Sequence, residues 1–206
     1  MKIAVFVSGG GTNLQAIIDK IACGELKNVE ICEVIASNDR AFALERAKKA
    51  GIPGKVISKK ILGDEAYDNA TLEELQNLGV DLVVLAGFLS MLGPKTVKAY
   101  ANRIINIHPA LIPAVCGKGM YGIRPHEAVL AKGAKISGAT VHFVNENYDE
   151  GPIILQKAVE VLQDDTPETL QQRIMKECEQ VILPKAIELI ADGKIEVVNN
   201  LVRIKN

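Results

Sequence analysis

The stretch Arg103–Pro113, RIINIHPALIP, decides the fold and the chemistry that the rest of the chain has to support. Its isoleucines are typical of a buried strand, and two polar residues, Asn106 and His108, stand at alternate positions. Strand side chains alternate between two faces, so these two should project to the same side. At the carboxyl end of a parallel strand, a carboxamide beside an imidazole suits proton transfer at a carbonyl group. The alternative is that both side chains only hydrogen-bond the loop backbone.

Length, composition and charge limit the possible classes of protein. The 206 residues, 48% of them hydrophobic and without a long apolar run, predict one soluble domain over residues 1–206. A net charge of −1 argues against a nucleic-acid partner, and no apolar stretch has the roughly 18 residues of a membrane helix. The apolar run in MKIAVFV is too short for a signal peptide, and the four cysteines lack metal-ligand spacing. We expect a cytoplasmic protein with reduced thiols, no metal and small-molecule substrates, acting as a monomer or homodimer.

The glycine-rich segment SGGGTN follows the apolar strand Lys2–Val7 and precedes a helical pattern. A strand, a glycine turn and a helix direct backbone N–H groups and the helix dipole at an anion. Thr12 or Asn13 could cap the helix and also reach a phosphate oxygen. A dinucleotide fingerprint would need a third glycine where Leu14 stands, so a single phosphate group fits better. The alternative is a tight turn that binds no ligand.

Segments of strand and helix character alternate along the whole chain. The expected strands are Lys2–Val7, Val29–Ser37, Lys55–Ser58, Asp81–Ala86, the apolar part of Arg103–Pro113, Ser137–Asn145 and Ile153–Val161. Helices are expected after the glycine segment, from Asn38–Arg40, from Asp64 to Gly79, from Pro94, over Pro125–Lys132, and from a Thr166 cap towards a kink at Pro184. A small hairpin, Ile195–Val198 with Leu201–Ile204, should close the chain. The alternation predicts an α/β fold with a doubly wound, mostly parallel sheet of about seven strands and helices on both faces.

Several residues outside these patterns have more than one interpretation. The segment 87–94 is apolar and begins with glycine, so it could form a wall of a flat pocket or simply belong to the core. The glycine-punctuated loop 114–122 suits a flexible cover for a substrate. We expect His126 to begin a surface helix and His142 to be a structural hydrogen-bonding residue. Asp39 could be a helix N-cap or a ribose-binding carboxylate.

Four motifs occur in one order along nearly the whole chain: VSGGGTNLQAIID, DLVVLAGFLSML, INIHPALIP and SGATVHFVNENYDEGPIILQ. Together they resemble the glycinamide ribonucleotide formyltransferases, folate-dependent enzymes of purine synthesis. The resemblance implies a Rossmann-like formyltransferase fold and 10-formyltetrahydrofolate as co-substrate, without a metal. It implies transfer of the formyl group to the amine of 5-phosphoribosylglycinamide. The products would be formylglycinamide ribonucleotide and tetrahydrofolate, in de novo purine (IMP) biosynthesis.

The same resemblance implies roles for individual residues. The catalytic residues would be Asn106, His108 and Asp149. The phosphate and the rest of the ribonucleotide would be held by Gly10, Gly11, Thr12, Asn13 and Glu179. The folate pocket would include Asp64, Leu89, Ser90, Met91, Leu92, Asn106 and Asn145.

The expected chemistry is consistent with those residues. Formyl transfer passes through a tetrahedral intermediate whose oxyanion Asn106 and a charged His108 could stabilise, at about 3 kcal/mol for each donor. His108 could act as general acid for the departing folate nitrogen. Asp149, if close, would raise the pKa of His108. No serine or cysteine stands in an activated context, which favours direct attack by the amine.

The chain departs from the family pattern at three places. Asp64 and Ser90 stand where the family often has arginines that reach the folate, so Lys59 or Lys60 could supply the missing cation. The loop 114–122 also differs from the shorter loop that many members have. These differences concern affinity for the folate tail more than the class of substrate.

Four other functions are compatible with parts of the sequence. A methionyl-tRNA formyltransferase would need a C-terminal extension and a basic surface. A formyltetrahydrofolate hydrolase would carry an N-terminal regulatory domain and usually a residue other than Pro109 after the histidine. A nucleotide-dependent oxidoreductase lacks its third glycine here. A non-catalytic module for phosphorylated metabolites would leave the combination of Asn106, His108 and Asp149 unexplained.

Overall fold

The computed structural model describes residues 1–205 and contains a sheet of seven strands. The strands are β1 (Lys2–Val7), β2 (Glu30–Ala36), β3 (Gly54–Val56), β4 (Leu82–Leu85), β5 (Ile104–His108), β6 (Ile136–Phe143) and β7 (Ile153–Glu160). Their order is β3-β2-β1-β4-β5-β6-β7. This arrangement confirms the predicted α/β class with a mostly parallel sheet. The contacts divide the chain within β5, into a unit that ends at Ile105 and a unit that begins at Asn106. A single domain over residues 1–206 stays a prediction.

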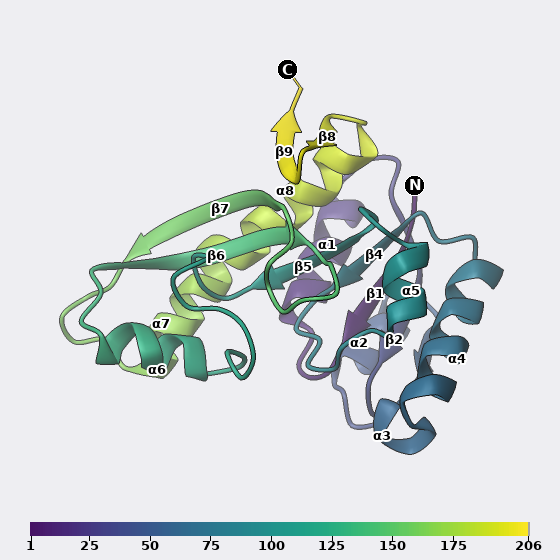
Figure 1. Ribbon diagram of the computed structural model, residues 1–206, viewed down its shortest axis with the longest axis horizontal. Helices are drawn as coiled ribbons and strands as arrows, with labels where there is room; N and C mark the ends of the chain where they lie inside the picture. Colours follow the sequence, from purple (N-terminus) through teal and green to yellow (C-terminus); the bar gives the residue numbers. More distant parts are fainter. Residues whose placement is uncertain (206) are drawn as a thin grey trace. The chain divides into compact units, whose positions relative to one another are not determined.

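The first unit is built around β1, which pairs in parallel with β2 and β4. All side chains from Ile3 to Val7 are fully buried, as expected for a strand covered on both faces. The helices of this unit are α1 (Thr12–Ala22), α2 (Ala43–Lys49), α3 (Lys59–Leu62), α4 (Asp64–Asn77) and α5 (Pro94–Ala99). Figure 1 shows α4 and α5 lying side by side. Asp68 of α4 joins them by accepting hydrogen bonds from the backbone N–H groups of Lys95 and Thr96, at 2.8 and 3.0 Å.

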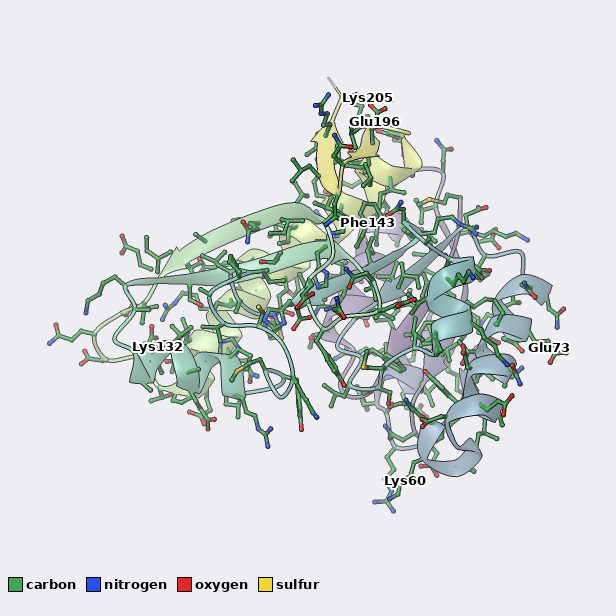
Figure 2. The ribbon with its side chains drawn as sticks, viewed as in Figure 1. Lys60, Glu73, Lys132, Phe143, Glu196 and Lys205 are labelled. Carbon is green, nitrogen blue, oxygen red and sulfur yellow. The ribbon has the colours of Figure 1, made fainter. Side chains whose placement is uncertain are left out.

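Two local expectations for the first unit are wrong, and a third is confirmed. Gly11, with a φ of 71°, is the N-cap of α1, and neither Thr12 nor Asn13 caps the helix with its side chain. Helix α2 begins only at Ala43, after Phe42 as N-cap, so Asp39 does not cap it. The pair Lys59-Lys60, expected to be a solvated surface pair, lies at the surface at the start of the short helix α3, and Lys60 extends into solvent (Figure 2).

The second unit contains the long antiparallel hairpin of β6 and β7 (Figure 1). Its helices are α6 (Arg124–Ala131), α7 (Pro167–Ile174) and α8 (Gln180–Ala191), and α6 packs against α7. Thr166 caps α7 as predicted, in a capping box with Thr169. The terminal hairpin is also confirmed, as β8 (Ile195–Val198) and β9 (Leu201–Ile204).

The turn of the terminal hairpin explains why its prediction holds. Asn199 and Asn200 adopt φ values of 51° and 62°, a left-handed conformation that asparagine tolerates and that two-residue hairpin turns require. Beyond the turn, Lys205 Nζ lies 3.6 Å from Glu196 Oε2 (Figure 2). This ion pair is exposed, so the contribution to stability is below about 1 kcal/mol.

The C-terminal helical region is interrupted before Pro184 and not at it. Met175–Glu179 forms a π-helical segment, η1, between α7 and α8. The Gln180 N–H donates to the Met175 carbonyl, five residues earlier, as in a π-helix. Pro184 lies within α8, where it lacks an N–H and its ring crowds the carbonyl of residue 180. The helix continues through Pro184, with a widened turn before it, and a kink at Pro184 stays a prediction.

Candidate active site

Strand β5 places Asn106 and His108 at its carboxyl end, as predicted. Ile105, before Asn106, and Ile107, between Asn106 and His108, are buried and hold the strand in the core. His108 is 3% exposed, whereas Asn106 is partly exposed. The two side chains therefore stand one strand step apart at the end where α/β proteins bind ligands.

The imidazole of His108 lies between two polar groups. Its Nε2 lies 2.7 Å from the carbonyl oxygen of Val115. A carbonyl oxygen only accepts, so Nε2 carries the hydrogen of this bond. On the other side of the ring, Nδ1 lies 3.6 Å from Asp149 Oδ2. His108 thus has a hydrogen-bond acceptor at Nε2 and, beside Nδ1, a carboxylate that is too distant for a hydrogen bond but favours the charged form of the ring.

Asp149 is fixed by its own set of contacts. Its Oδ2 accepts a hydrogen bond of 2.9 Å from the Gly117 N–H, and Oδ1 lies 3.6 Å from His142 Nε2. The backbone of Asp149 has a φ of 55°, a conformation that aspartate tolerates better than most residues. The loop 114–122 therefore contacts His108 through Val115 and Asp149 through Gly117.

The electrostatic environment only partly matches the expectation for His108. Burial lowers the pKa of His108 below its ordinary value of 6.5, and the Asp149 carboxylate and the Val115 carbonyl oppose that effect without reversing it. The predicted effect of Asp149, to raise the pKa of His108, is confirmed in sign, and burial outweighs it. Burial raises the pKa of Asp149, but His142, the charge of His108 and the Gly117 N–H together hold it below its usual range.

His142 belongs to this cluster, which the sequence did not indicate. Its Nδ1 lies 2.8 Å from the Phe143 carbonyl and must donate to it. In the neutral ring, Nε2 is then an acceptor, and the Asn106 amide nitrogen lies 3.2 Å away. The predicted hydrogen-bonding role of His142 is confirmed, but its partner is a catalytic candidate. The only signal was that Thr140 and His142 share one face of the predicted strand.

His126 is not a surface residue, contrary to expectation. It is fully buried in α6, and neither ring nitrogen has a hydrogen-bond partner within residues 1–205. Burial, with a smaller effect of the His108 charge, lowers the pKa of His126 to about 4. A polar, charged neighbourhood in the sequence, RPHE, concealed this environment.

The glycine-rich segment of the first unit has the geometry of an anion-binding turn. Three successive carbonyls accept hydrogen bonds from the segment 38–46. Ser8 O accepts from the Asn38 amide, Gly9 O from the Ala43 N–H, and Gly10 O from Arg46 Nε. In a trans peptide the following N–H points opposite to the carbonyl. The N–H groups of residues 9, 10 and 11 therefore point away from the segment 38–46, and the helix α1 begins directly after them.

Gly11 has no tolerance for a side chain. With its φ of 71°, a Cβ built there would lie 2.6 Å from the Cβ of Ala43, closer than such atoms approach. The other predicted phosphate-binding residues, Gly10, Thr12 and Asn13, adjoin it in the loop and the first turn of α1. Glu179 lies in the second unit, in η1, and is 8% exposed.

The predicted folate-binding segment 89–92 follows β4. Its backbone is fixed to the glycine segment, because the Leu89 N–H donates to Ser8 Oγ at 2.9 Å. Leu89 is 61% exposed and Leu92 is buried, while Ser90 and Met91 are intermediate. An exposed leucine beside a fixed backbone suits contact with a flat, apolar ligand.

Two further folate candidates lie at the surface. Asp64 is exposed at the start of α4, and its Oδ1 lies 2.9 Å from Lys59 Nζ. Lys59 thus pairs with Asp64, which stands where the family often has an arginine whose charge Lys59 was expected to replace. Lys60 is then the exposed cation of α3. Asn145, of the second unit, accepts a hydrogen bond from the Asn147 N–H at 3.0 Å.

Residues 1–205 contain neither a candidate metal site nor a candidate membrane helix. No group of three or more histidine, cysteine, aspartate or glutamate side chains is placed to hold a metal ion in that range. None of the helices there is both long and apolar enough to cross a membrane. The four cysteines are free thiols.

Comparison with known proteins gives one consistent family. The model of the formyl transferase family matches residues 1–187. The chain is 41% identical over 197 residues to the chloroplastic phosphoribosylglycinamide formyltransferase of Arabidopsis thaliana, covering 95% of this chain and 67% of that protein. It is 39% identical to the phosphoribosylglycinamide formyltransferase of Haemophilus influenzae, covering 97% of this chain and 92% of that one.

Solved structures agree with these relatives. The crystal structure of glycinamide ribonucleotide transformylase 1 from Symbiobacterium toebii matches with a TM-score of 0.93 and 42% identity, over 100% of this chain and 94% of that one. The chain spans only 19% of the trifunctional purine biosynthetic protein adenosine-3 of Bos taurus, which it also resembles. The family model, the near full-length relatives and the solved structure all lead to the same conclusion: this chain belongs to the formyl transferase family.

Proposed function

We propose that this protein transfers the formyl group of 10-formyltetrahydrofolate to the amine of 5-phosphoribosylglycinamide. The products are formylglycinamide ribonucleotide and tetrahydrofolate, a step of purine biosynthesis. The observation that carries the proposal is the group of Asn106, His108 and Asp149 at the carboxyl end of β5, in a chain of the formyl transferase family. Relatives of near full length that bear the name phosphoribosylglycinamide formyltransferase support the choice of acceptor.

The reaction needs an attack, a stabilised oxyanion and a proton transfer. The substrate amine attacks the formyl carbon directly, and its new C–N bond gives a tetrahedral intermediate with an oxyanion. Asn106 and the protonated ring of His108 donate hydrogen bonds to that oxygen. The C–N bond to folate nitrogen 10 then breaks as His108 delivers a proton to that nitrogen, and the attacking nitrogen passes its surplus proton to the now neutral imidazole, which restores the imidazolium. Asp149 stabilises the imidazolium.

Each substrate has a binding region in this proposal. The phosphate of the ribonucleotide binds the N–H groups around Gly10 and Gly11 with Thr12 and Asn13, and Glu179 contacts the glycinamide part. The folate lies along Leu89–Leu92, with Asn106 and Asn145 at the formyl end and Asp64 near its tail. The hydrogen bonds from residues 38–46 to the carbonyls of residues 8–10 support the phosphate assignment. The exposed Leu89 supports the folate assignment.

We further propose a single catalytic domain, because the family match runs from residue 1 to residue 187 and thus includes parts of both units. The protein acts in the cytoplasm, as a monomer or a homodimer. Its partners are the two small-molecule substrates, without a nucleic acid or a membrane.

A product-resolved assay tests the proposal. The protein is incubated with 10-formyltetrahydrofolate with and without glycinamide ribonucleotide, and the formylated product and free formate are measured separately. We expect formylated ribonucleotide from the wild type and at least a hundredfold less from His108→Ala. His126→Ala serves as the matched histidine control. Formate release independent of the amine would indicate a hydrolase, and neither product from folded protein would refute the proposal.

A further inference from the structure

Gln156 of β7 lies directly opposite Thr140 of β6 in the antiparallel hairpin. Side chains of directly opposed residues project from the same face of a sheet and can touch. Here the Gln156 amide nitrogen lies 3.0 Å from Thr140 Oγ1. Both side chains also hydrogen-bond a third segment, residues 110–112. This segment begins two residues after His108.

Thr140 uses its full hydrogen-bonding capacity on this contact. Its hydroxyl donates to the Ala110 carbonyl at 2.7 Å and accepts from the Ile112 N–H at 3.1 Å. The second acceptor position takes the Gln156 amide. A hydroxyl has one donor and two acceptor sites, so the buried Thr140 is fully satisfied only when Gln156 is present.

The second hydrogen of the Gln156 amide group completes the attachment. The nitrogen lies 2.9 Å from the Ile112 carbonyl. The two side chains together therefore bind the Ala110 carbonyl and both backbone polar groups of Ile112. Gln156 itself is largely exposed, so its role is not visible from burial.

The attached segment leads straight back to the catalytic imidazole. Three residues after Ile112, the Val115 carbonyl accepts the hydrogen bond of His108 Nε2 at 2.7 Å. Two residues further, the Gly117 N–H binds Asp149. Residues 108–115 thus form a loop that is closed at its ends by His108 and Val115 and held at its middle by Thr140 and Gln156.

We propose that Gln156 is a positioning residue for His108, acting through Ile112 and the loop that carries Val115. The proposal rests on the proposed function, in which His108 transfers the proton. The partners of the Gln156 amide group are Ile112 and Thr140, so it acts on His108 through them. Its amide group fixes the position of Ile112 in the loop. The loop in turn fixes the position of the Val115 carbonyl, which orients the imidazole.

A purely structural role predicts a different outcome from a positioning role. A structural contact of an exposed glutamine would change stability slightly and leave catalysis unchanged. A positioning role predicts a lower kcat with little change in either KM, because substrate binding does not depend on the imidazole orientation. It also predicts a lower pKa of His108, since the Val115 carbonyl raises that pKa.

The test compares Gln156→Leu and Gln156→Glu with the wild type. Leucine keeps the approximate volume and loses both donors, while ionised glutamate keeps the shape and loses both donors. We expect both to lower kcat about tenfold with KM values within twofold. Lys157→Leu, its exposed neighbour on the opposite face of β7, is the matched control and should leave kcat within twofold. Thermal unfolding of each variant confirms that it is folded.

A second readout does not depend on turnover. The ring C–H resonances of His108, followed by NMR against pH, give its pKa directly, and we expect a lower pKa in Gln156→Leu than in the wild type. An unchanged pKa and an unchanged kcat in folded variants would overturn the proposal. If the wild type itself forms no formylated ribonucleotide, the proposed function fails, and the NMR titration still decides whether Gln156 positions His108.

Discussion

Asn106 and His142, 36 positions apart in the sequence, are joined by a hydrogen bond of 3.2 Å between the amide nitrogen and Nε2. Because the Phe143 carbonyl takes the proton-bearing Nδ1, the neutral ring can only accept at Nε2. The contact therefore fixes which end of the Asn106 amide is the nitrogen. It also leaves the second amide hydrogen available for a developing oxyanion.

Replacing His142 tests this relationship. In His142→Leu the amide of Asn106 loses its partner and can rotate, so we expect kcat to fall about tenfold, the equivalent of one hydrogen bond. His142→Gln restores an acceptor in a similar place and should recover part of the loss. Steady-state kinetics with both substrates make the comparison. Equal rates for the leucine variant and the wild type would show that His142 does not orient Asn106.

Asp149→Asn should shift the pH dependence of the reaction. The carboxylate raises the pKa of His108, so its removal lowers that pKa further. Activity that needs the protonated ring falls as pH rises through this pKa, and in the variant the fall should occur at lower pH. The pH profile of kcat measures the shift. Glu150→Gln is the neighbouring acidic control, and a profile for Asp149→Asn that coincides with the wild type contradicts the assignment.

His126 should make the protein sensitive to acid. Its pKa is about 4 when folded and has an ordinary value of 6.5, so the unfolded chain binds the proton more readily between these values. Stability from this group is therefore complete above pH 6.5 and is lost as pH falls towards 4, by roughly 3 kcal/mol in total.

Urea unfolding at several pH values tests the effect of His126. His126→Leu removes the titrating group and also two buried, unpaired nitrogens, so its stability should depend less on pH over this window. Glu127→Gln, the next residue, is the control. Parallel pH dependences of the wild type and His126→Leu would rule out this origin of acid sensitivity.

Gly11→Ala should impair both folding and ribonucleotide binding. The added Cβ meets Ala43 at 2.6 Å, and the φ of 71° is strained for alanine. We expect a loss of stability of about 1–3 kcal/mol and a higher KM for the ribonucleotide. Gly9→Ala is a matched control, because a Cβ there has no heavy atom within 4 Å. Similar values for the two variants would mean that the turn is more adaptable than its geometry indicates.

Arg46→Met should weaken phosphate binding without a direct contact to the phosphate. Arg46 Nε donates to the Gly10 carbonyl at 2.8 Å, and its Nη1 donates to Gln15 Oε1 at 3.0 Å. Loss of the first bond allows the Gly10–Gly11 peptide to turn, so the KM of the ribonucleotide should rise about tenfold while the KM of the folate stays constant. Arg40→Met removes a nearby exposed cation and controls for charge alone.

The strands, and the placement of Asn106 and His108 on one strand, could be predicted because their signals are local. Residues Ile104–His108 alternate as a strand must, and the Asn199-Asn200 turn fixes the terminal hairpin. The glycine segment was predicted for the same reason. The caps of α1 and α2 were missed because glycine and phenylalanine occupy them, with no side-chain oxygen to indicate a start.

The environments of the histidines could not be predicted, because they depend on distant partners. His142 contacts Asn106 and Asp149 only after β5, β6 and the loop that carries Asp149 come together. The burial of His126 depends on how α6 packs, and its neighbours in sequence are polar. The net pKa of His108 likewise depends on burial, which no motif encodes.

The π-helical segment η1 divides the pattern of hydrophobic residues along the C-terminal helices. An α-helix turns by about 100° per residue, and a π-helical turn takes up one residue more, so the sequence pattern of buried residues shifts by one position between α7 and α8. The widened turn accommodates that extra residue, so the two flanking helices keep their buried faces. Deleting one residue from Met175–Glu179 would therefore preserve those faces but remove the widened turn in which Glu179 now lies.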